Sequence, residues 1–220
     1  MPRRGSSQLP AAEQKQGVLH QVRSPRQVHQ VGKEVIILEG PDGGGKTTLL
    51  MNLLDEFPSI EQHAKASTST GGPVDNIEVW AKEDVVTWPL QPLSFYDRHP
   101  MFSEPFYGSI LRGGFHEWFG STEAAELGQN MLTKGLIVFC LPKLETVTAN
   151  LAAEEQLSGV VDHIDDLYNL YQRQMIGMAE DFPNTVFHYD YENPTDYDDL
   201  LAVINAHQTR YNRKTNGRTA

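Results

Sequence analysis

The sequence predicts an α/β fold with a doubly wound parallel sheet flanked by helices on both faces. Continuous apolar runs at 35–38 and 136–141 have the pattern of central strands that are buried on both sides. Helical and strand-like segments alternate along the chain, which is typical of parallel sheets with crossover helices. A glycine-rich loop also separates the first apolar run from an amphipathic helix, as the phosphate-binding unit of such folds requires.

The other elements follow in order, each bounded by turn-forming residues. Gly135 ends one helix, Pro142 ends the second apolar strand, and Asn193-Pro194 turns into the last helix. Strands are expected at 35–38, 64–70, 93–96, 136–141 and 185–189. Helices are expected at 47–54, 74–88, 103–111, 121–134, 143–157, 160–179 and 196–211.

The chain of 220 residues suits one domain with short extensions. Residues 1–32 are rich in Gln, Ser, Pro and Arg, and we expect a disordered tail there. This tail is basic, with five Lys or Arg residues against one Glu, although the whole chain has a net charge of −11. The folded domain is expected at 33–212, with a C-terminal tail at 213–220.

Charge and apolar content disfavour some partners, although DNA remains possible. An acidic body is a poor platform for DNA, because affinity for phosphate backbones comes mainly from Lys and Arg. No apolar run approaches the roughly 20 residues that cross a bilayer, and the N-terminus lacks the apolar segment of a secretory signal. The single cysteine, Cys140, suits a reducing compartment and a core position. We therefore expect a cytoplasmic protein that binds a small molecule.

The glycine-rich loop has the pattern that binds the phosphates of a nucleoside triphosphate. Glycines let the backbone curl so that successive N–H groups point inward, and the following helix adds its positive end. Lys46 is expected to reach the β- and γ-phosphates, and Thr47 to bind Mg²⁺. The predicted cofactors are therefore ATP and Mg²⁺. The predicted ATP-binding residues are Gly40, Pro41, Asp42, Gly43, Gly44, Gly45, Lys46, Thr47 and Thr48.

Two blocks of the sequence have a spacing typical of one family. The first is the loop itself, with an aspartate at its third position. The second is an Asp-Arg-His block followed by a serine, an aromatic residue and a glycine, at Asp97-Arg98-His99, Ser103 and Phe106-Tyr107-Gly108. Together the two blocks resemble the thymidylate kinase family. The resemblance extends loosely over 34–205 and implies a P-loop kinase fold.

The resemblance also implies roles for individual residues. Asp42 would meet the hydroxyl of the acceptor sugar, and Asp97 would hold Mg²⁺ through water or orient the attacking oxygen. Arg98 would neutralise the phosphoryl groups as they approach each other, as phosphoryl transfer needs positioning and cationic stabilisation. Lys46, Asp97 and Arg98 are thus the expected catalytic residues. The expected substrate-binding residues are Asp42, Arg98, Ser103, Tyr107 and Arg112.

Three departures from that family concern the acceptor. The stretch 67–73 lacks the arginine that grips the acceptor monophosphate, and the expected lid region at about 150–166 contains no Arg or Lys. Tyr107 stands where the family often has Gln. Replacement cations could come from Arg112, Lys65 or Arg173.

Several functions therefore remain open. The expected reaction is transfer of the γ-phosphoryl group of ATP to a dTMP-like deoxynucleotide. An alternative is a kinase acting on an unphosphorylated hydroxyl, in a deoxynucleoside or in hydroxymethyluracil of phage DNA. A phage-encoded protein would act in the host cytoplasm. The other alternative is a P-loop nucleotide switch without acceptor chemistry. The sequence allows a homodimer and does not set the oligomeric state.

Overall fold

The computed structural model describes residues 35–63, 72, 74–88, 93–153 and 159–216. Its centre is a sheet of five parallel strands in the order β2-β3-β1-β4-β5. The strands are β1 (Val35–Glu39), β2 (Glu61–Gln62), β3 (Ser94–Asp97), β4 (Gly135–Cys140) and β5 (Val186–Tyr189). Strand β1 therefore lies in the middle, and its carboxyl end leads directly into the glycine-rich loop.

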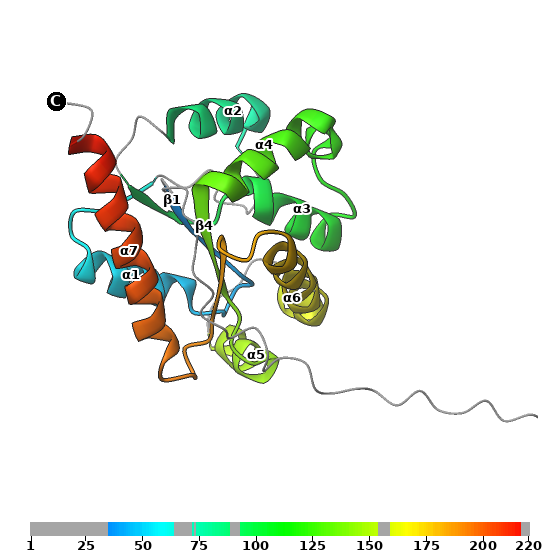
Figure 1. Ribbon diagram of the computed structural model, residues 1–220. Coiled ribbons are helices and arrows are strands. Elements are labelled where there is room, and N and C mark those ends of the chain that lie inside the picture. The colour runs from blue at the N-terminus through cyan, green and yellow to red at the C-terminus, as the bar shows by residue number, and fades with distance from the viewer. Residues whose placement is uncertain (1–34, 64–71, 73, 89–92, 154–158, 217–220) are drawn as a thin grey trace, which may run out of the picture.

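Helices cover both faces of this sheet (Figure 1). Helix α1 and helix α7 lie on one face, whereas α2, α3, α4 and α6 lie on the other, with α5 at one end. The helices are α1 (Lys46–Glu56), α2 (Ile77–Thr87), α3 (Pro100–Leu111), α4 (Thr122–Lys134), α5 (Leu144–Ala152), α6 (Ile164–Asp181) and α7 (Asp196–Asn216). Short 3₁₀ turns occur at η2 (Glu117–Gly120) and η3 (Val161–His163). None of the helices in the described ranges is both long and apolar enough to cross a membrane.

The alternation of side chains along β1 divides the core into two. Val35 and Ile37 pack toward α2, α3, α4 and α6, whereas Ile36 and Leu38 pack toward α1 and α7. All four are at most 1% exposed, and burial of each such side chain contributes about 1.5–3 kcal/mol. This two-sided burial explains why the strand reads as a continuous apolar run.

The structure confirms the predicted parallel α/β fold and adjusts several boundaries. Helix α5 ends at Ala152, and α6 begins at Ile164 after a 3₁₀ turn, so both are shorter than the predicted ranges. The strand expected at 64–70 lies outside the described residues. The described strand β2 ends at Gln62, just before that stretch. Strand β2 is exposed and polar, so no apolar pattern marked it.

A small third cluster of apolar side chains fills the space between α2, η2 and α4. Ala81, Trp118 and Ala124 are buried in it, and Trp80 packs against them. Trp88, at the end of α2, is fully buried nearby in the larger core. All three tryptophans of the chain therefore lie on the α2 side of the sheet.

Candidate active site

The loop between β1 and α1 forms a tight cradle in which glycine is required. Gly40 has φ +140°, and a Cβ there would lie 2.5 Å from the carbonyl oxygen of Cys140. A Cβ on Gly44 would lie 2.8 Å from the same oxygen. Contacts this short do not occur between real side chains and backbone, so the sequence pattern of the loop follows from its packing against the end of β4.

The cradle ends at the amino end of α1, where no side chain caps the helix. Gly45 precedes the helix with φ +82°, and no acidic residue lies in the first turn. The unpaired N–H groups and the helix dipole therefore favour an anion at this point. Thr47 and Thr48 are exposed in the first turn, so their hydroxyl groups are accessible to a ligand.

Lys46 is buried, and its Nζ donates a 2.6 Å hydrogen bond to the carbonyl oxygen of Pro41 across the loop. Burial, together with the nearby charge of Arg98, lowers the pKa of Lys46 to about 8, although Asp42 and Asp97 act in the opposite direction. The lysine is thus held inside the loop with its charge poorly compensated, which favours binding of a phosphate group.

Arg98 reaches the loop from the end of β3. It adopts a left-handed conformation with φ +63°, and its amide donates a 2.9 Å hydrogen bond to the carbonyl of Leu38. Its Nε and Nη2 donate to the carbonyl of Gly40 at 3.3 and 3.1 Å, and Nη2 lies 2.7 Å from Oδ1 of Asp42. The structure therefore brings together Lys46, Asp42 and Arg98, which the sequence had placed in one site.

Tyr107 of α3 completes this group. Its hydroxyl donates to Oδ2 of Asp42 at 3.1 Å and accepts from the amide of Asp42 at 3.1 Å and from Nη2 of Arg98 at 2.5 Å. The guanidinium also lies 4.7 Å from the centre of the tyrosine ring. Asp42, Arg98 and Tyr107, here called the arginine cluster, thus connect the phosphate loop to β3 and α3.

Glu39, the last residue of β1, is a fully buried acid beneath this cluster. Its Oε1 accepts a 2.8 Å hydrogen bond from the amide of His99, and its Oε2 accepts one of 3.2 Å from the hydroxyl of Tyr171 in α6. Burial raises the pKa of Glu39 to about 7, although His99, Arg98 and Lys46 favour the charged form. No sequence motif marks this residue.

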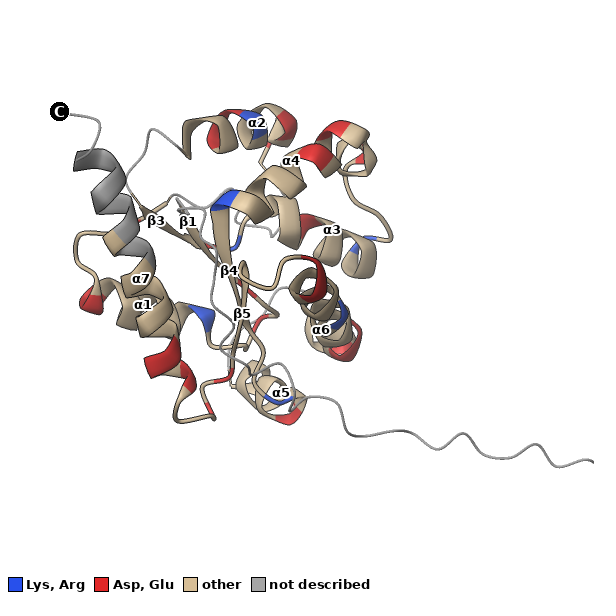
Figure 2. Ribbon diagram, viewed as in Figure 1, with Lys and Arg blue, Asp and Glu red and all other residues tan. Residues whose placement is uncertain are grey.

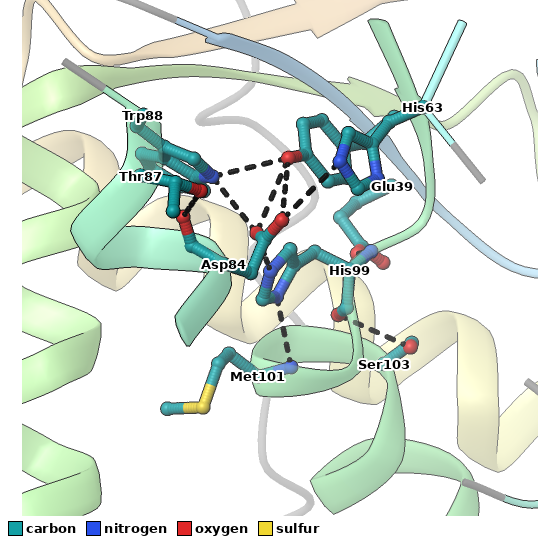
Figure 3. A network of polar contacts seen from close by, with 9 residues as sticks. Glu39, His63, Asp84, Thr87, Trp88, His99, Met101 and Ser103 are labelled. Carbon is teal, nitrogen blue, oxygen red and sulfur yellow. Dashed lines mark hydrogen bonds and ion pairs between the residues drawn. The ribbon is translucent and has the colours of Figure 1, made fainter. Parts of the chain in front are cut away.

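A second buried acid, Asp84 of α2, holds the junction between β3 and α3 (Figure 3). Its carboxylate accepts from Nε1 of Trp88 at 2.8 Å and from the hydroxyl of Tyr96 at 2.9 Å, and lies 3.2 Å from Nε2 of His99. Nε2 of His63, which follows β2, lies 3.4 Å away. Burial opposes ionisation of Asp84, but these hydrogen bonds lower its pKa.

His99 links this network to the arginine cluster. Its Nδ1 accepts the amide of Met101 at 3.2 Å, which caps α3, so Nε2 carries the proton and donates to Asp84. Burial lowers the pKa of His99, which keeps the ring neutral. His99 follows Arg98 directly, so Asp84 and Glu39 together fix the backbone from which Arg98 extends.

The opposite side of the phosphate loop is held by Asn150 of α5 and Tyr191, which follows β5. Nδ2 of Asn150 donates to the carbonyl of Gly43 at 2.7 Å and to the hydroxyl of Tyr191 at 2.8 Å. The tyrosine ring lies over Gly45, where a Cβ would come within 3.0 Å of it. Asn150 falls at the start of the expected lid, of which residues 154–158 lie outside the described ranges.

The remaining predicted residues lie around this centre. Asp97 ends β3 beside Leu38 of β1, close enough to influence the pKa of Lys46. Ser103 donates from Oγ to the carbonyl of His99 at 3.2 Å, within α3. Arg112, at the end of α3, forms an ion pair with the buried Glu104. Cys140 is buried, and burial raises its pKa to about 12, as expected of a core thiol.

Comparison with known proteins gives structural neighbours alone. No family model matches the sequence, and no curated protein matches it. The YorR protein of Bacillus subtilis, in complex with phosphorylated GDP, has a TM-score of 0.56 at 15% identity, covering 78% of this chain and 95% of its own. Deoxyadenosine kinase from M. mycoides, with products dCMP and a flexible dCDP bound, has a TM-score of 0.55 at 13% identity, covering 78% and 98%.

The same deoxyadenosine kinase with bound dCTP has a TM-score of 0.53 at 14% identity, covering 78% of this chain and 99% of its own. These chains are covered almost completely, so the likeness includes the whole domain and not the phosphate loop alone. The chain therefore has the α/β P-loop fold seen in nucleotide and deoxynucleoside kinases.

Proposed function

We propose that this protein is a P-loop kinase that transfers the γ-phosphoryl group of ATP to a deoxynucleotide or deoxynucleoside acceptor. The observation that carries the proposal is the position of Arg98, whose guanidinium is hydrogen-bonded to the phosphate loop itself through Gly40 and Asp42. A cation at this place can neutralise the charge that develops on the γ-phosphoryl group as it moves toward an acceptor.

The donor site consists of the glycine cradle, the first turn of α1 and Lys46. The inward N–H groups and Lys46 would hold the β- and γ-phosphates, and the first turn would hold the phosphate nearer the sugar. Asn150 and Tyr191 would keep the cradle in shape from the side opposite Arg98. Nη1 of Arg98 makes no hydrogen bond with a described residue, so it has donors for an oxygen of the transferring group.

The residues present fit Mg²⁺ as the partner of ATP. Mg²⁺ prefers oxygen donors and is commonly held by one or two protein groups together with substrate phosphates and water. Thr47 supplies an accessible hydroxyl and Asp97 a carboxylate near Lys46, and no group of three or more metal-binding side chains occurs in the described residues. Bound there, Mg²⁺ would neutralise charge on the phosphates.

In the reaction the protein supplies position and charge. An acceptor oxygen must lie in line with the γ-phosphorus, and Asp42 and Tyr107 sit at the edge of the loop where such an oxygen would arrive. Lys46 and Arg98 stabilise the phosphoryl group from two sides. The names of the structural neighbours support a nucleoside or nucleotide as acceptor, since one holds the products dCMP and dCDP.

The test is an acceptor screen with ATP labelled in its γ-phosphate. Deoxynucleosides and their monophosphates are each incubated with the protein, and both labelled product and ADP are measured. A kinase gives ADP release that depends on one acceptor and labelled acceptor in equal amount. Release of ADP at the same rate with every acceptor and with none would support the nucleotide switch instead.

Arg98→Lys and Arg98→Ala sharpen this test. Both are expected to lower kcat by at least tenfold with a smaller change in the Kd of ATP. The reason is that the guanidinium would contact the γ-phosphoryl group more strongly in the transition state than in bound ATP. Lys134→Ala removes a cation at the amino end of β4, at the edge of the sheet opposite the phosphate loop, and is the control that should keep wild-type turnover.

A further inference from the structure

We infer that the hydroxyl of Tyr107 is a positioning group for phosphoryl transfer, an inference that rests on the kinase function proposed above. The sequence places Tyr107 among the expected substrate-binding residues. In the structure its hydroxyl contacts the phosphate loop and Arg98, and its ring is buried. The tyrosine would therefore act on the reaction through Arg98 and would not itself hold the acceptor.

The hydroxyl of Tyr107 uses its hydrogen-bonding capacity within the protein. A phenol offers one donor and up to two acceptor positions. The proton is donated to Oδ2 of Asp42 at 3.1 Å, and the oxygen accepts from the amide of Asp42 at 3.1 Å and from Nη2 of Arg98 at 2.5 Å. Burial raises the pKa of Tyr107, so this proton stays in place at neutral pH. An acceptor would have to displace one of these partners to reach the hydroxyl.

The ring of Tyr107 fixes the plane of the guanidinium. Cζ of Arg98 lies 4.7 Å from the centre of the ring, within the range of a cation–π contact. Nε and Nη2 of Arg98 donate at the same time to the carbonyl of Gly40, and Nη2 also donates to Asp42. A planar group that is bonded along one edge and covered on one face by a ring has little freedom to rotate.

The two side chains differ in exposure as this role requires. The side chain of Arg98 is 24% exposed, whereas Tyr107 as a whole is 7% exposed. The guanidinium can therefore reach a ligand while the tyrosine lies behind it. Tyr107 is supported in turn by the ring of Tyr171 in α6, whose centre lies 6.3 Å away and whose hydroxyl donates to Glu39 at 3.2 Å.

A fixed direction matters for a cation in an acidic protein. The chain has 29 Asp and Glu residues against 18 Lys and Arg residues, and acidic segments recur over the described ribbon (Figure 2). A long side chain in such surroundings can turn toward more than one carboxylate, and a misplacement of about 1 Å in a catalytic site can cost about a hundredfold in rate. Tyr107 keeps Arg98 beside Gly40 and Asp42, where the proposed donor phosphate would lie.

Tyr107→Phe tests the hydroxyl alone, because it keeps the ring and its buried contacts. With the full-length protein, γ-labelled ATP and the best acceptor of the screen, kcat should fall by about fivefold or more. The KM of the acceptor and the Kd of ATP should each change by less than about twofold. Tyr197→Phe, at a half-buried position of α7 on the other face of the sheet, is the matched control and should keep wild-type values.

A second measurement asks whether the hydroxyl acts through Arg98. Arg98→Lys replaces the planar fork by a flexible ammonium group but keeps a cation. In that background, Tyr107→Phe should lower kcat by less than about a further twofold, because the group that the hydroxyl positions has already been removed. An equal loss in both backgrounds would mean that the hydroxyl acts on the substrate independently of Arg98, and would overturn the inference.

The remaining outcomes separate this inference from the kinase proposal. A raised KM of the acceptor at unchanged kcat would make Tyr107 a substrate-binding residue and overturn the inference alone. Unchanged kcat and KM would do the same. Loss of ATP binding, or of the circular dichroism of the folded protein, would show that the hydroxyl holds the loop as a whole and would overturn the selective role. No acceptor-dependent turnover in the wild type would overturn both proposals.

Discussion

Oε1 of Glu39 accepts a 2.8 Å hydrogen bond from the amide of His99, one residue beyond Arg98. The amide of Arg98 itself donates to Leu38, the residue before Glu39. Two consecutive residues of β1 thus hold two consecutive residues after β3. This double attachment explains how a non-glycine residue keeps φ +63°, a conformation that costs about 1–3 kcal/mol unless its surroundings enforce it.

The first prediction concerns the pH dependence of stability through Glu39. Its pKa of about 7 in the folded protein lies above the ordinary value of 4.5, so the folded state binds more protons between these values. Its contribution to stability is therefore fully present below pH 4.5 and is lost as pH rises through 7, by roughly 3 kcal/mol in total. Glu39→Gln should remove this loss.

Urea unfolding of both proteins at pH 5 and pH 8 measures the difference. The free energy of unfolding of wild type should fall relative to that of Glu39→Gln between the two values. Glu56→Gln, on the exposed end of α1, is the control for loss of a carboxylate and should run parallel to wild type. Parallel behaviour of Glu39→Gln as well would show that Glu39 is charged at both values.

The second prediction concerns the protonation of Lys46. Its pKa is lowered to about 8 mainly by burial, so above pH 8 the protein must take up a proton to present a charged lysine to ATP. The Kd of ATP is expected to rise about tenfold per pH unit between 8.5 and 10. Isothermal titration in buffers of different ionisation enthalpy should detect uptake of close to one proton, and Lys46→Arg should abolish that uptake.

The third prediction concerns the shape of the phosphate loop. Gly40→Ala places a Cβ 2.5 Å from a carbonyl oxygen at φ +140°, so we expect loss of ATP binding and destabilisation of at least about 2 kcal/mol. Gly128→Ala, within α4 and with open space around its Cβ, should stabilise by up to about 1 kcal/mol. Thermal unfolding and ATP titration of the two variants separate these effects.

The fourth prediction concerns the contact of Asn150 with the loop. Asn150→Ala removes the hydrogen bonds to Gly43 and Tyr191, and should raise the Kd of ATP about three- to tenfold, since each such bond contributes about 0.5–1.5 kcal/mol. Thr148→Ala, which removes only an exposed hydrogen bond to Leu144 within α5, is the control. Equal affinity of both variants would mean that the loop keeps its shape without Asn150.

The sequence was sufficient to predict the parallel α/β fold, and it placed in one site Lys46, Asp42 and Arg98, which the structure brings together. The strands with the clearest sequence pattern, β1 and β4, are those whose two faces are both buried, because burial leaves a continuous apolar run. The glycine loop was recognisable because its backbone geometry tolerates few other residues. Strand β2 was missed because its exposed polar residues carry no such pattern.

The supporting residues could not be predicted for a different reason. Glu39 and Asp84 are buried acids. An acidic side chain is rarely buried in a protein core unless hydrogen-bond donors satisfy its carboxylate. Those donors lie on other elements, as His99 and Tyr171 do for Glu39. Pairing across such distances in the chain leaves no periodic signal. Asn150 is similar, since its partner Gly43 lies 107 residues away.

The gathering of Trp80, Trp88 and Trp118 on one side of the sheet has a practical consequence for ligand titrations. Helices α1 and α7 contain no tryptophan, so the tryptophan emission of the protein originates in the half that carries α2. Trp80 and Trp88 also lie 5.2 and 5.9 Å from the ring of His99, next to Arg98. Tryptophan fluorescence is therefore an unlabelled optical probe of events at the end of β3, and it reports little on the helices of the other face.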